Sequence, residues 1–489
     1  MQEAADRISE LEAQVAARDE LIASQHQTIC ELRARVAELE AQVAKLTALL
    51  NRNSTNSHLP PSSDGPGARS GGGGKPNRGG GGKGTKKRKR GGQPGHRGHR
   101  RNLVPPEQVD HVVDLFPPSC TNCWLELPRT PDPNPKRDQV AELPPIEPEI
   151  TEYRRHAVGC VCGHTTRAAR ELVPASCFGP RLMSVVALFT GVYHLSRRQA
   201  VRVLSDVLGV EMSLGSVSAV EKRVSAAIEP AVAEAWAESD AAEVKHADAT
   251  SWLEAGAKRT LWVIATAMVT VFKVVADGGS AQVKPLFGAC RGILVSDRAS
   301  VFSFWKMKFR QVCWAHLVRR FISFSERDGP ASAVGHELLG YTELLFRYWR
   351  EYRGGRLPRA QFLAWMAPVR VNLEACLERA VAAGIDNVSG SCADLLAHRE
   401  ALWTFLSHAG VPPTNNHAEQ ELRSFVLWRK RSFGANSARG HLFAEGIMTV
   451  AHTARKQGLH VLTFLTQTCE VRVNGGQAPS LLRARQAAA

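Results

Sequence analysis

The sequence predicts a multidomain α+β protein of 489 residues. Three observations lead to this prediction. A chain of this length exceeds what one hydrophobic core usually organises, and its hydrophobic content of 44% is enough for several ordinary cores. Apolar residues recur every seven positions near the N-terminus, which predicts a long helix. Short runs rich in β-branched residues follow after position 244, and they predict the strands of a sheet.

Residues 1–50 predict a coiled coil. One seam position of its heptads is almost entirely β-branched and the other is mostly Leu, a combination that favours a parallel two-stranded pairing. The two series are Ile8, Val15, Ile22, Ile29, Val36, Val43 and Leu50, and Leu11, Leu32, Leu39 and Leu46. The alternative is a lone amphipathic helix that packs on its own chain, but the repeat persists over six heptads. We therefore expect a homodimer or higher oligomer through this segment.

Residues 51–102 predict a disordered, basic, Gly-rich linker, because they contain almost no apolar residues that could form a core. Between Gly65 and Arg101 there are 12 Lys or Arg residues and no acid, so most of the net charge of +15 lies here. A solubilising spacer would not require charge of one sign. We expect sequence-independent contacts with DNA phosphates, above all from Lys86, Lys87, Arg88, Lys89 and Arg90.

Residues 103–175 predict a small zinc-binding domain. Cys120 and Cys123 form one close pair, and Cys160 and Cys162 form another. Two thiolate pairs on separate loops can close a tetrahedral structural Zn²⁺ site. His164 is an alternative fourth ligand, and two pairs of buried free thiols are the alternative to a metal site. In a reducing compartment such pairs indicate metal binding before disulfides.

Residues 176–240 predict a helical, DNA-binding region that resembles a helix-turn-helix. The expected helices are Arg197–Leu208 and Leu214–Ile228, with Gly209 as the stop between them and Ser213 as the N-cap of the second helix. An ordinary helical hairpin explains the same pattern equally well. The nearby basic residues favour DNA binding: Arg197, Arg198, Lys222 and Arg223.

Three acidic residues follow in an order that predicts a metal site. Asp248 and Asp297 lie at or near the ends of predicted strands, and Glu419 lies in the first turn of a predicted helix. Two further strands are expected between the first two acids, so one mixed sheet would gather all three acids at its edge. Carboxylates gathered in this way bind Mg²⁺, and two such ions catalyse in-line displacement at phosphorus.

Each acid also has a simpler explanation. Asp commonly ends a strand in a turn. Asn416 followed three residues later by Glu419 has the spacing of a capping box at a helix start. Taken singly, these explanations are favoured; taken together, the order of the elements favours a metal site.

The remaining elements complete the predicted catalytic region. Helical patterns between Asp297 and Glu419 predict an α-helical insertion at about residues 328–410, because a gap of this length does not remain a loop in a compact domain. The expected helices are Ser332–Trp349, Arg359–Ala382 and Ala393–His408. Cys313 and His316 are expected to position substrate from a helix, since two ligands do not close a zinc site. Basic residues that follow Glu419 are expected to contact DNA: Arg423, Arg429, Lys430 and Arg431.

Several of these motifs together resemble the insertion-sequence-66 family of bacterial DDE transposases. The resemblance extends from about Leu46 to about Leu465, and its motifs occur in the expected order. They are Ala247-Asp248, Val295-Ser296-Asp297, Cys313-Trp314-Ala315-His316, Asn415-Asn416-His417-Ala418-Glu419, Arg429-Lys430 and the segment from Gly458 to Leu465. One departure is Ala249, where the family usually has Glu.

The resemblance implies a ribonuclease-H-like α/β catalytic domain over residues 241–458, followed by a C-terminal segment, residues 459–489. It implies that Asp248, Asp297 and Glu419 are catalytic and hold two Mg²⁺ or Mn²⁺ ions, and it supports four-cysteine zinc ligation. The implied activity is Mg-dependent cleavage of double-stranded DNA at insertion-sequence ends and strand transfer into target DNA, with helper proteins from the same element. The alternatives are a catalytically inactive dimeric DNA-binding protein, and a ribonuclease or resolvase on the same fold.

The sequence contains no apolar run long enough to span a bilayer. We therefore expect a cytoplasmic, nucleoid-associated protein without membrane contact.

Overall fold

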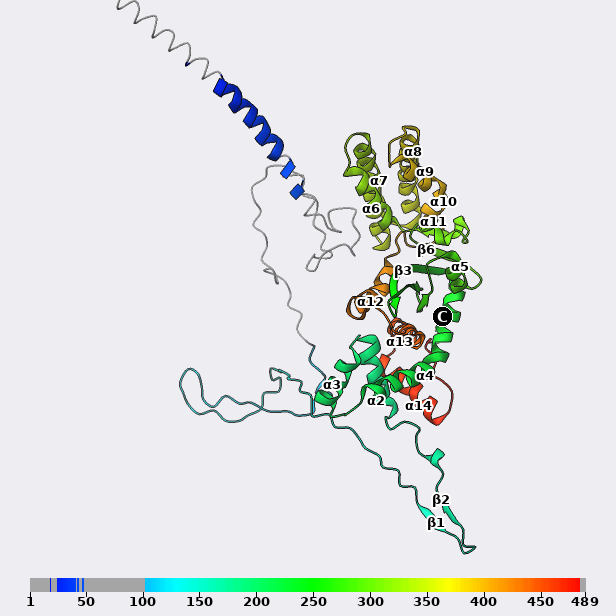
Figure 1. Ribbon diagram of the computed structural model, residues 1–489. Coiled ribbons are helices and arrows are strands. Elements are labelled where there is room, and N and C mark those ends of the chain that lie inside the picture. The colour runs from blue at the N-terminus through cyan, green and yellow to red at the C-terminus, as the bar shows by residue number, and fades with distance from the viewer. Residues whose placement is uncertain (1–17, 19–23, 41, 44–45, 48–101, 484–489) are drawn as a thin grey trace, which may run out of the picture.

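The computed structural model describes residues 18, 24–40, 42–43, 46–47 and 102–483 (Figure 1). Residues 24–40 are helical, as the heptad pattern predicts. The rest of the expected coiled coil lies largely outside the described residues, and so does the basic linker with Lys86–Arg90. None of the helices that the structure does describe is long and apolar enough to cross a membrane.

A five-stranded mixed sheet forms the centre of the molecule (Figure 1). Its spatial order is β5 (Thr270–Val275), β4 (Ala257–Ala265), β3 (Val244–Glu254), β6 (Ile293–Ser296) and β7 (Arg310–Val312). β3, β4 and β5 are antiparallel, whereas β6 pairs in parallel with both β3 and β7. The predicted mixed sheet is therefore present. β7 was not predicted, because Arg310 and Gln311 are polar although both are buried.

The turn between β3 and β4 shows why this sheet begins with a hairpin. Ala255 and Gly256 both have positive φ, 48° and 87°. Two successive residues with positive φ form the tight turn that matches the twist of the flanking strands. The register that follows places Asp248 opposite Val263 of β4.

The helix α13 (Ala438–Lys456) lies along the edge strand β5 and binds its free backbone N–H groups. Thr453 Oγ1 accepts from Thr270 N at 3.1 Å, Thr449 Oγ1 from Phe272 N at 3.2 Å, and Glu445 Oε1 from Val274 N at 2.7 Å. Four residues of a helix advance about 6 Å, and two residues of a strand advance nearly 7 Å. Every fourth residue of α13 can therefore bond to every second residue of β5, and this match holds for three hydrogen bonds.

Helices at the base of Figure 1 share one hydrophobic core with this sheet. They are α2 (Pro180–Ala187), α3 (Arg197–Leu208), α4 (Leu214–Ala241) and α14 (Val461–Asn474). The prediction for α3 is confirmed, and Gly209 ends it with a φ of 62°. α4 begins at the predicted N-cap, Ser213, but continues past Ile228 to Ala241. Val217, Val220 and Val224 of α4 are buried, so part of the expected recognition helix packs into this core.

The predicted helical insertion is present and forms a second core on β6 and β7. It comprises α7 (Pro330–Arg353), α8 (Arg359–Ala382), α9 (Ser389–Ala397), α10 (Arg399–Leu402) and α11 (Thr404–Ser407). α6 (Trp314–Ser325) precedes the predicted bounds and packs on α7 in the same core. The single helix expected from Ala393 to His408 is wrong. Trp403 and Phe405 are both buried, and Thr404 Oγ1 donates to Arg310 O of β7, so the chain turns here to follow the sheet.

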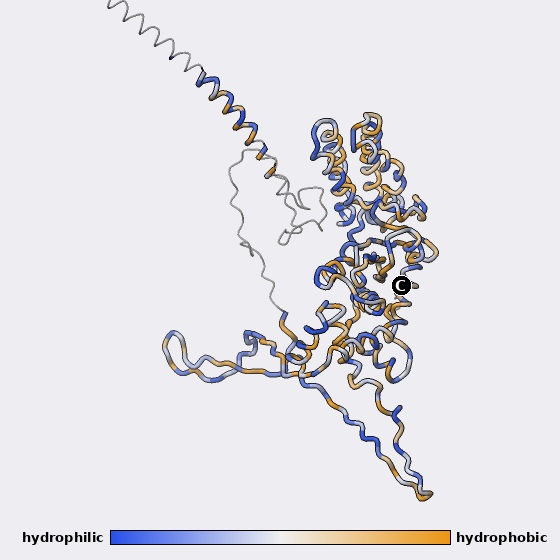
Figure 2. The backbone as a smooth tube through the Cα atoms, viewed as in Figure 1, coloured by the Kyte–Doolittle hydropathy of each residue, from blue (hydrophilic) through white to orange (hydrophobic). Residues whose placement is uncertain are grey.

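Residues 102–171 extend away from the helical body, and none of them is buried. This segment contains the short antiparallel strands β1 (Ala157–Gly159) and β2 (Thr165–Arg167). Figure 2 shows that hydrophobic residues concentrate among the packed helices and also occur along this extended segment. The segment coincides with the predicted zinc-binding domain and has no apolar core of its own.

Candidate active site

Three different elements position the three predicted carboxylates. Asp248 lies within β3, Asp297 follows the neighbouring strand β6, and Glu419 lies in the first turn of α12 (Asn416–Ser432). Asp297 Oδ1 accepts from Ala299 N at 3.1 Å, which closes the turn after β6. The structure brings the three acids within electrostatic reach of one another, because the charges of Glu419 and Asp297 both act on Asp248.

Asp248 is the acid most affected by this arrangement. Burial and, to a lesser extent, the charges of Glu419 and Asp297 together raise the pKa of Asp248 to about 7. The Ala249 N–H, which donates to Oδ1 at 2.8 Å, and Arg319 oppose this rise. A nearby cation would favour the ionised form of a carboxylate that burial and neighbouring acids keep protonated. The donor set is all oxygen, so these residues fit a hard divalent ion such as Mg²⁺.

Glu419 does not form the capping box that its spacing allowed. Asn416 is already the first residue of α12, and the N-cap is Asn415, whose side chain makes no capping hydrogen bond. The capping explanation for Glu419 is therefore wrong. The Glu419 carboxylate faces α6 instead, and its side chain is 31% exposed.

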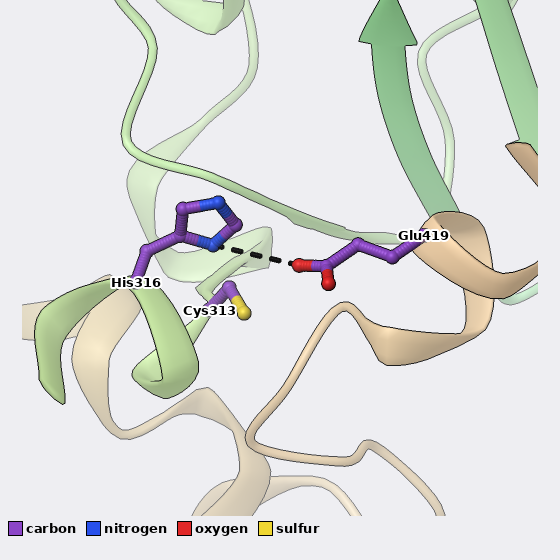
Figure 3. A group of neighbouring side chains, drawn as sticks. All are labelled: Cys313, His316 and Glu419. Carbon is purple, nitrogen blue, oxygen red and sulfur yellow. Dashed lines mark ion pairs between the residues drawn. The ribbon is translucent and has the colours of Figure 1, made fainter. Parts of the chain in front are cut away.

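Cys313 and His316 lie beside Glu419 (Figure 3). Cys313 directly follows β7 and occupies the N-cap position of α6, and His316 lies in the first turn of that helix. The distance from His316 Nδ1 to Glu419 Oε1 is 3.7 Å. Burial lowers the pKa of His316, against the charge of Glu419, and burial raises the pKa of the Cys313 thiol. Both residues therefore contact the predicted site, and their positioning role stays a prediction.

The buried side chain of Asn415 joins the elements that hold this site. Its Nδ2 donates to Ala247 O at 2.7 Å, next to Asp248, and its backbone N donates to Cys313 Sγ at 3.1 Å. Its Oδ1 lies 3.3 Å from Nδ1 of His246. The motif containing Asn415 was identified from sequence, but its role was missed. Its amide partners lie 168 and 169 positions away in the chain.

A second buried cluster, also not predicted, fixes α12 from another side. Glu421 binds His452 and lies 3.2 Å from Lys456 Nζ, and Lys456 donates to Thr266 O at 2.9 Å. Although burial opposes it, hydrogen bonds from His417 and His452 and the charge of Lys456 hold the pKa of Glu421 well below its usual range. Glu421 is therefore ionised at neutral pH and anchors α12 to α13.

A pocket of about 740 Å³ is lined by several arginines, and Asp297 and His316 also line it. Burial lowers the pKa of Arg320, and the charges of Arg298 and Arg327 lower it further. Several arginines around one pocket favour the binding of anions, although Arg298 already pairs with Asp394 at 2.9 Å. Sequence reasoning missed this pocket, because its arginines are dispersed along the chain: Arg298, Arg319, Arg320 and Arg327.

The basic residues predicted after Glu419 separate into two groups. Arg429 turns back to β3, where it donates to Thr250 Oγ1 at 2.8 Å and to Ser251 O at 3.0 Å. It lines a pocket of about 750 Å³ together with Lys430, Lys258 and Arg259. Arg423 and Arg431 are exposed. Arg429 is therefore partly engaged within the protein, and DNA contacts by this group stay a prediction.

The predicted zinc ligands lie in the extended segment. The structure brings Cys120 close to Cys123 and Cys160 close to Cys162, and each of Cys120 and Cys160 has its pKa lowered by hydrogen bonds within its pair. In the part of the chain that the structure describes, these two pairs are not gathered into one group of ligands. The four-cysteine zinc site stays a prediction.

Comparisons with known proteins identify the family. Residues 1–102 match a model described as "Family of unknown function (DUF6444)". Among curated proteins, the chain is similar to "Uncharacterized protein y4qI" of Sinorhizobium fredii, with 28% identity over 162 residues that cover 32% of this chain and 29% of that protein. The chain thus matches less than a third of this relative's length. Residues 175–442, more than half of the chain, match the model described as "Transposase IS66 family" and include all three acids. The chain therefore belongs to the IS66 family of transposases.

Proposed function

We propose that this transposase catalyses Mg-dependent DNA cleavage at insertion-sequence ends and strand transfer into target DNA. The observation that supports this most directly is the effect of Glu419 and Asp297 on Asp248, whose pKa rises to about 7 through burial and these two charges. Three carboxylates from β3, β6 and α12 that cannot all be ionised alone are a site for divalent cations.

The roles of the residues follow from their positions. Asp248, Asp297 and Glu419 would hold two Mg²⁺ or Mn²⁺ ions, which supply activation of the attacking oxygen and stabilisation of the leaving oxygen. A water oxygen attacks phosphorus at the transposon end and the 3′ oxygen leaves as a hydroxyl. That hydroxyl then attacks a phosphodiester of the target and displaces its 3′ oxygen. The arginine-lined pocket beside Asp297 binds phosphates of the strand and holds it at the acids.

The flanking segments contribute DNA binding and assembly. The basic residues Lys86–Arg90 add salt-dependent affinity for double-stranded DNA, together with Arg423, Lys430 and Arg431. The N-terminal coiled coil forms a homodimer or higher oligomer that brings DNA ends together. A structural Zn²⁺ on Cys120, Cys123, Cys160 and Cys162 would compensate for the missing core of residues 102–171. We place the protein in the cytoplasm with the nucleoid, acting with helper proteins of its element.

A strand-transfer assay tests the proposal. Purified full-length protein is mixed in Mg²⁺ with labelled DNA that carries the element's own end and with a plasmid target. Wild type should join the end to the plasmid, with neighbouring proteins of the element added where they are needed. Asp248→Asn, Asp297→Asn and Glu419→Gln should each bind the end but lose joining, by at least about 10³-fold, since each removes a ligand of the reacting centre.

The matched control is Asp206→Asn on α3, where the side chain is exposed and far from the acids in sequence and element. It should join like wild type. If wild type binds the end and never joins it, with every helper protein present, the proposed chemistry is wrong and the protein only binds DNA. If the three acid variants join normally, the site has been assigned to the wrong residues.

A further inference from the structure

Cys313, His316 and Glu419 form a cluster that differs chemically from the three-carboxylate site. It offers one sulfur, one imidazole nitrogen and one carboxylate oxygen, all within 4.8 Å of one another. Sulfur and imidazole select zinc-class ions, whereas Mg²⁺ prefers oxygen alone. Among the described residues, these are the three side chains of His, Cys, Asp or Glu that lie close enough together to bind one ion.

Two atoms in the cluster have unsatisfied hydrogen-bonding capacity. His316 Nδ1 and Glu419 Oε1 are both buried, and neither has a hydrogen-bond partner among the described residues. Figure 3 shows the imidazole of α6 and the carboxylate of α12 facing each other, with the Cys313 sulfur beside them. Buried polar atoms without partners are rare and require a specific explanation. A cation between them satisfies both atoms at once.

The distances suit a zinc-class ion. Ligands about 2.1 Å from zinc, arranged tetrahedrally, are about 3.4 Å apart. His316 Nδ1 and Glu419 Oε1 are already separated by 3.7 Å, which is too long for a hydrogen bond and close to that value. The ligand atoms of all three side chains lie within 4.8 Å of one another. His316 Nδ1 therefore lies almost at the distance from Glu419 Oε1 that two ligands of one zinc ion would have.

Burial disfavours a thiolate at Cys313, and local backbone groups offset part of this effect. Asn415 N donates to Cys313 Sγ at 3.1 Å, and the sulfur lies at the N-terminus of α6, whose backbone amides carry partial positive charge. The site is also rigid, because Cys313 is fully buried and joins β7 directly to α6. On ion binding, the thiol proton is released to solvent and the sulfur becomes the third ligand.

We infer that Cys313, His316 and Glu419 bind a single zinc-class divalent ion, and that this ion inhibits the Mg-dependent reaction by engaging Glu419. Three protein ligands leave a fourth position for water. The inhibitory part of this inference rests on the proposed function, because Glu419 belongs to both sets of ligands. The same side chain thus alternates between an oxygen-only set with Asp248 and Asp297 and a mixed set with Cys313 and His316.

Cobalt binding tests the site without any DNA. Full-length protein is stripped of metal, given one equivalent of Zn²⁺ to fill the predicted four-cysteine site, and titrated with Co²⁺. Wild type should develop the sulfur-to-cobalt charge-transfer band of a bound thiolate. Cys313→Ser should lose that band, and Cys313→Ser and His316→Ala should each bind the ion at least about tenfold more weakly, a loss seen even for outer ligand partners.

Three comparisons make the result specific. Cys290→Ser, a half-buried cysteine outside both clusters, should keep the full band. Asp248→Asn should also keep it, because Asp248 belongs only to the carboxylate site. Cys313→Ser retains an acceptor for Asn415 N–H, and an unchanged urea midpoint shows that it folds. A band that persists in folded Cys313→Ser, or no band in wild type, overturns the inference.

The reaction itself provides a second and separate readout. Added Zn²⁺ should inhibit Mg²⁺-supported strand transfer by wild type, and Cys313→Ser should require at least about tenfold more Zn²⁺ for the same inhibition. A Cys313-dependent cobalt band in a protein that never joins DNA supports the metal site and contradicts the proposed function. Strand transfer that Zn²⁺ inhibits equally in wild type and Cys313→Ser contradicts the inhibitory role of this site.

Discussion

At the scale of the residue, Asp248 links protonation to stability. In the unfolded chain its carboxyl ionises at the ordinary value of 3.8, whereas burial and the neighbouring acids raise its folded pKa to about 7. Between these values the folded protein binds the extra proton, so the stability of the metal-free protein falls as pH rises from about 4 to about 7. Above pH 7 Asp248 is ionised in the folded protein as well, and its buried charge lowers the free energy of unfolding by the full amount.

Asp248→Asn should therefore stabilise the metal-free protein at pH 8, by on the order of 2 kcal/mol, and by much less at pH 5. Urea unfolding of both proteins at the two pH values measures this difference. Mg²⁺ should raise the unfolding free energy of wild type more than that of the variant. Asp206→Asn is the control. If Asp248→Asn is no more stable than wild type at pH 8, the ionised form of Asp248 does not destabilise the folded protein.

Asn415 should contribute to stability more than its neighbour Asn416. Asn415→Ala leaves Ala247 O without its amide donor and His246 Nδ1 without its partner, both within the core. We expect a loss of roughly 2–3 kcal/mol in the free energy of unfolding, measured with urea. Asn416→Ala removes an exposed side chain one position away and should cost under about 0.5 kcal/mol. Equal losses would mean that the hydrogen bonds of Asn415 add nothing net.

These residues also show how much of the site the sequence could reveal. Asp297 and Glu419 were predicted because each lies at the end or the beginning of an element, whereas Asp248, which was expected near a strand end, lies inside β3. Asn415, Arg298 and Arg320 were not, since their roles depend on partners from distant segments, and no local pattern reports such contacts. The type of an element is a local property, whereas the partners of a side chain depend on the whole fold.

At the scale of the element, Gly335 permits the close packing of α7 against α6. A Cβ at this position would lie 2.2 Å from the backbone N of Ser325, so any larger residue forces the two helices apart. Gly335→Ala should destabilise the protein by roughly 2–4 kcal/mol, measured by urea unfolding.

Gly340 in the same helix provides the matched control. A Cβ there meets no heavy atom within 4 Å. Gly340→Ala should be neutral or should stabilise by up to about 1 kcal/mol, because alanine favours the helix. The close approach of α6 and α7 would be unimportant if both variants behaved alike.

The elements were predicted well where local pattern and final environment agree. The strand before Asp297 is a regular apolar run, and α3 and α8 were predicted with their observed ends. β7 was missed, because Arg310 and Gln311 are not apolar: Arg310 is buried with a hydrogen bond to Asp297 O, and Gln311 with one to Leu402 O of the insertion. The helix expected from Ala393 to His408 has a continuous helical pattern, but packing of Trp403 and Phe405 breaks it into separate turns.

At the scale of the whole molecule, no residue that the structure describes covers the apolar seam of the N-terminal helix. Ile29, Leu32, Val36 and Leu39 are between 45% and 60% exposed. Pairing with the same seam of a second copy would bury them. Full-length protein should therefore sediment as a dimer or larger species in analytical ultracentrifugation, and the double variant Leu32→Glu, Leu39→Glu should sediment as a monomer.

The control places the same charges on the outer face of this helix. Ala34→Glu with Ala37→Glu lies away from the seam and should leave the sedimentation of wild type unchanged. A seam variant that still associates like wild type would assign oligomerisation to another surface.

The covering of the sheet edges affects how copies of this protein can meet. Along β5, side chains of α13 occupy the backbone N–H groups that an incoming strand would need, and along β7 the insertion binds Arg310 O and the side chain of Gln311. Open sheet edges are the usual templates for strand addition and aggregation. Because both edges are covered, the sheet is protected from intermolecular strand exchange, even when many copies accumulate on one DNA molecule. Copies of the protein must then associate through helices and through DNA. The size of such an assembly is set by these specific contacts and not by the addition of strands to an open sheet edge.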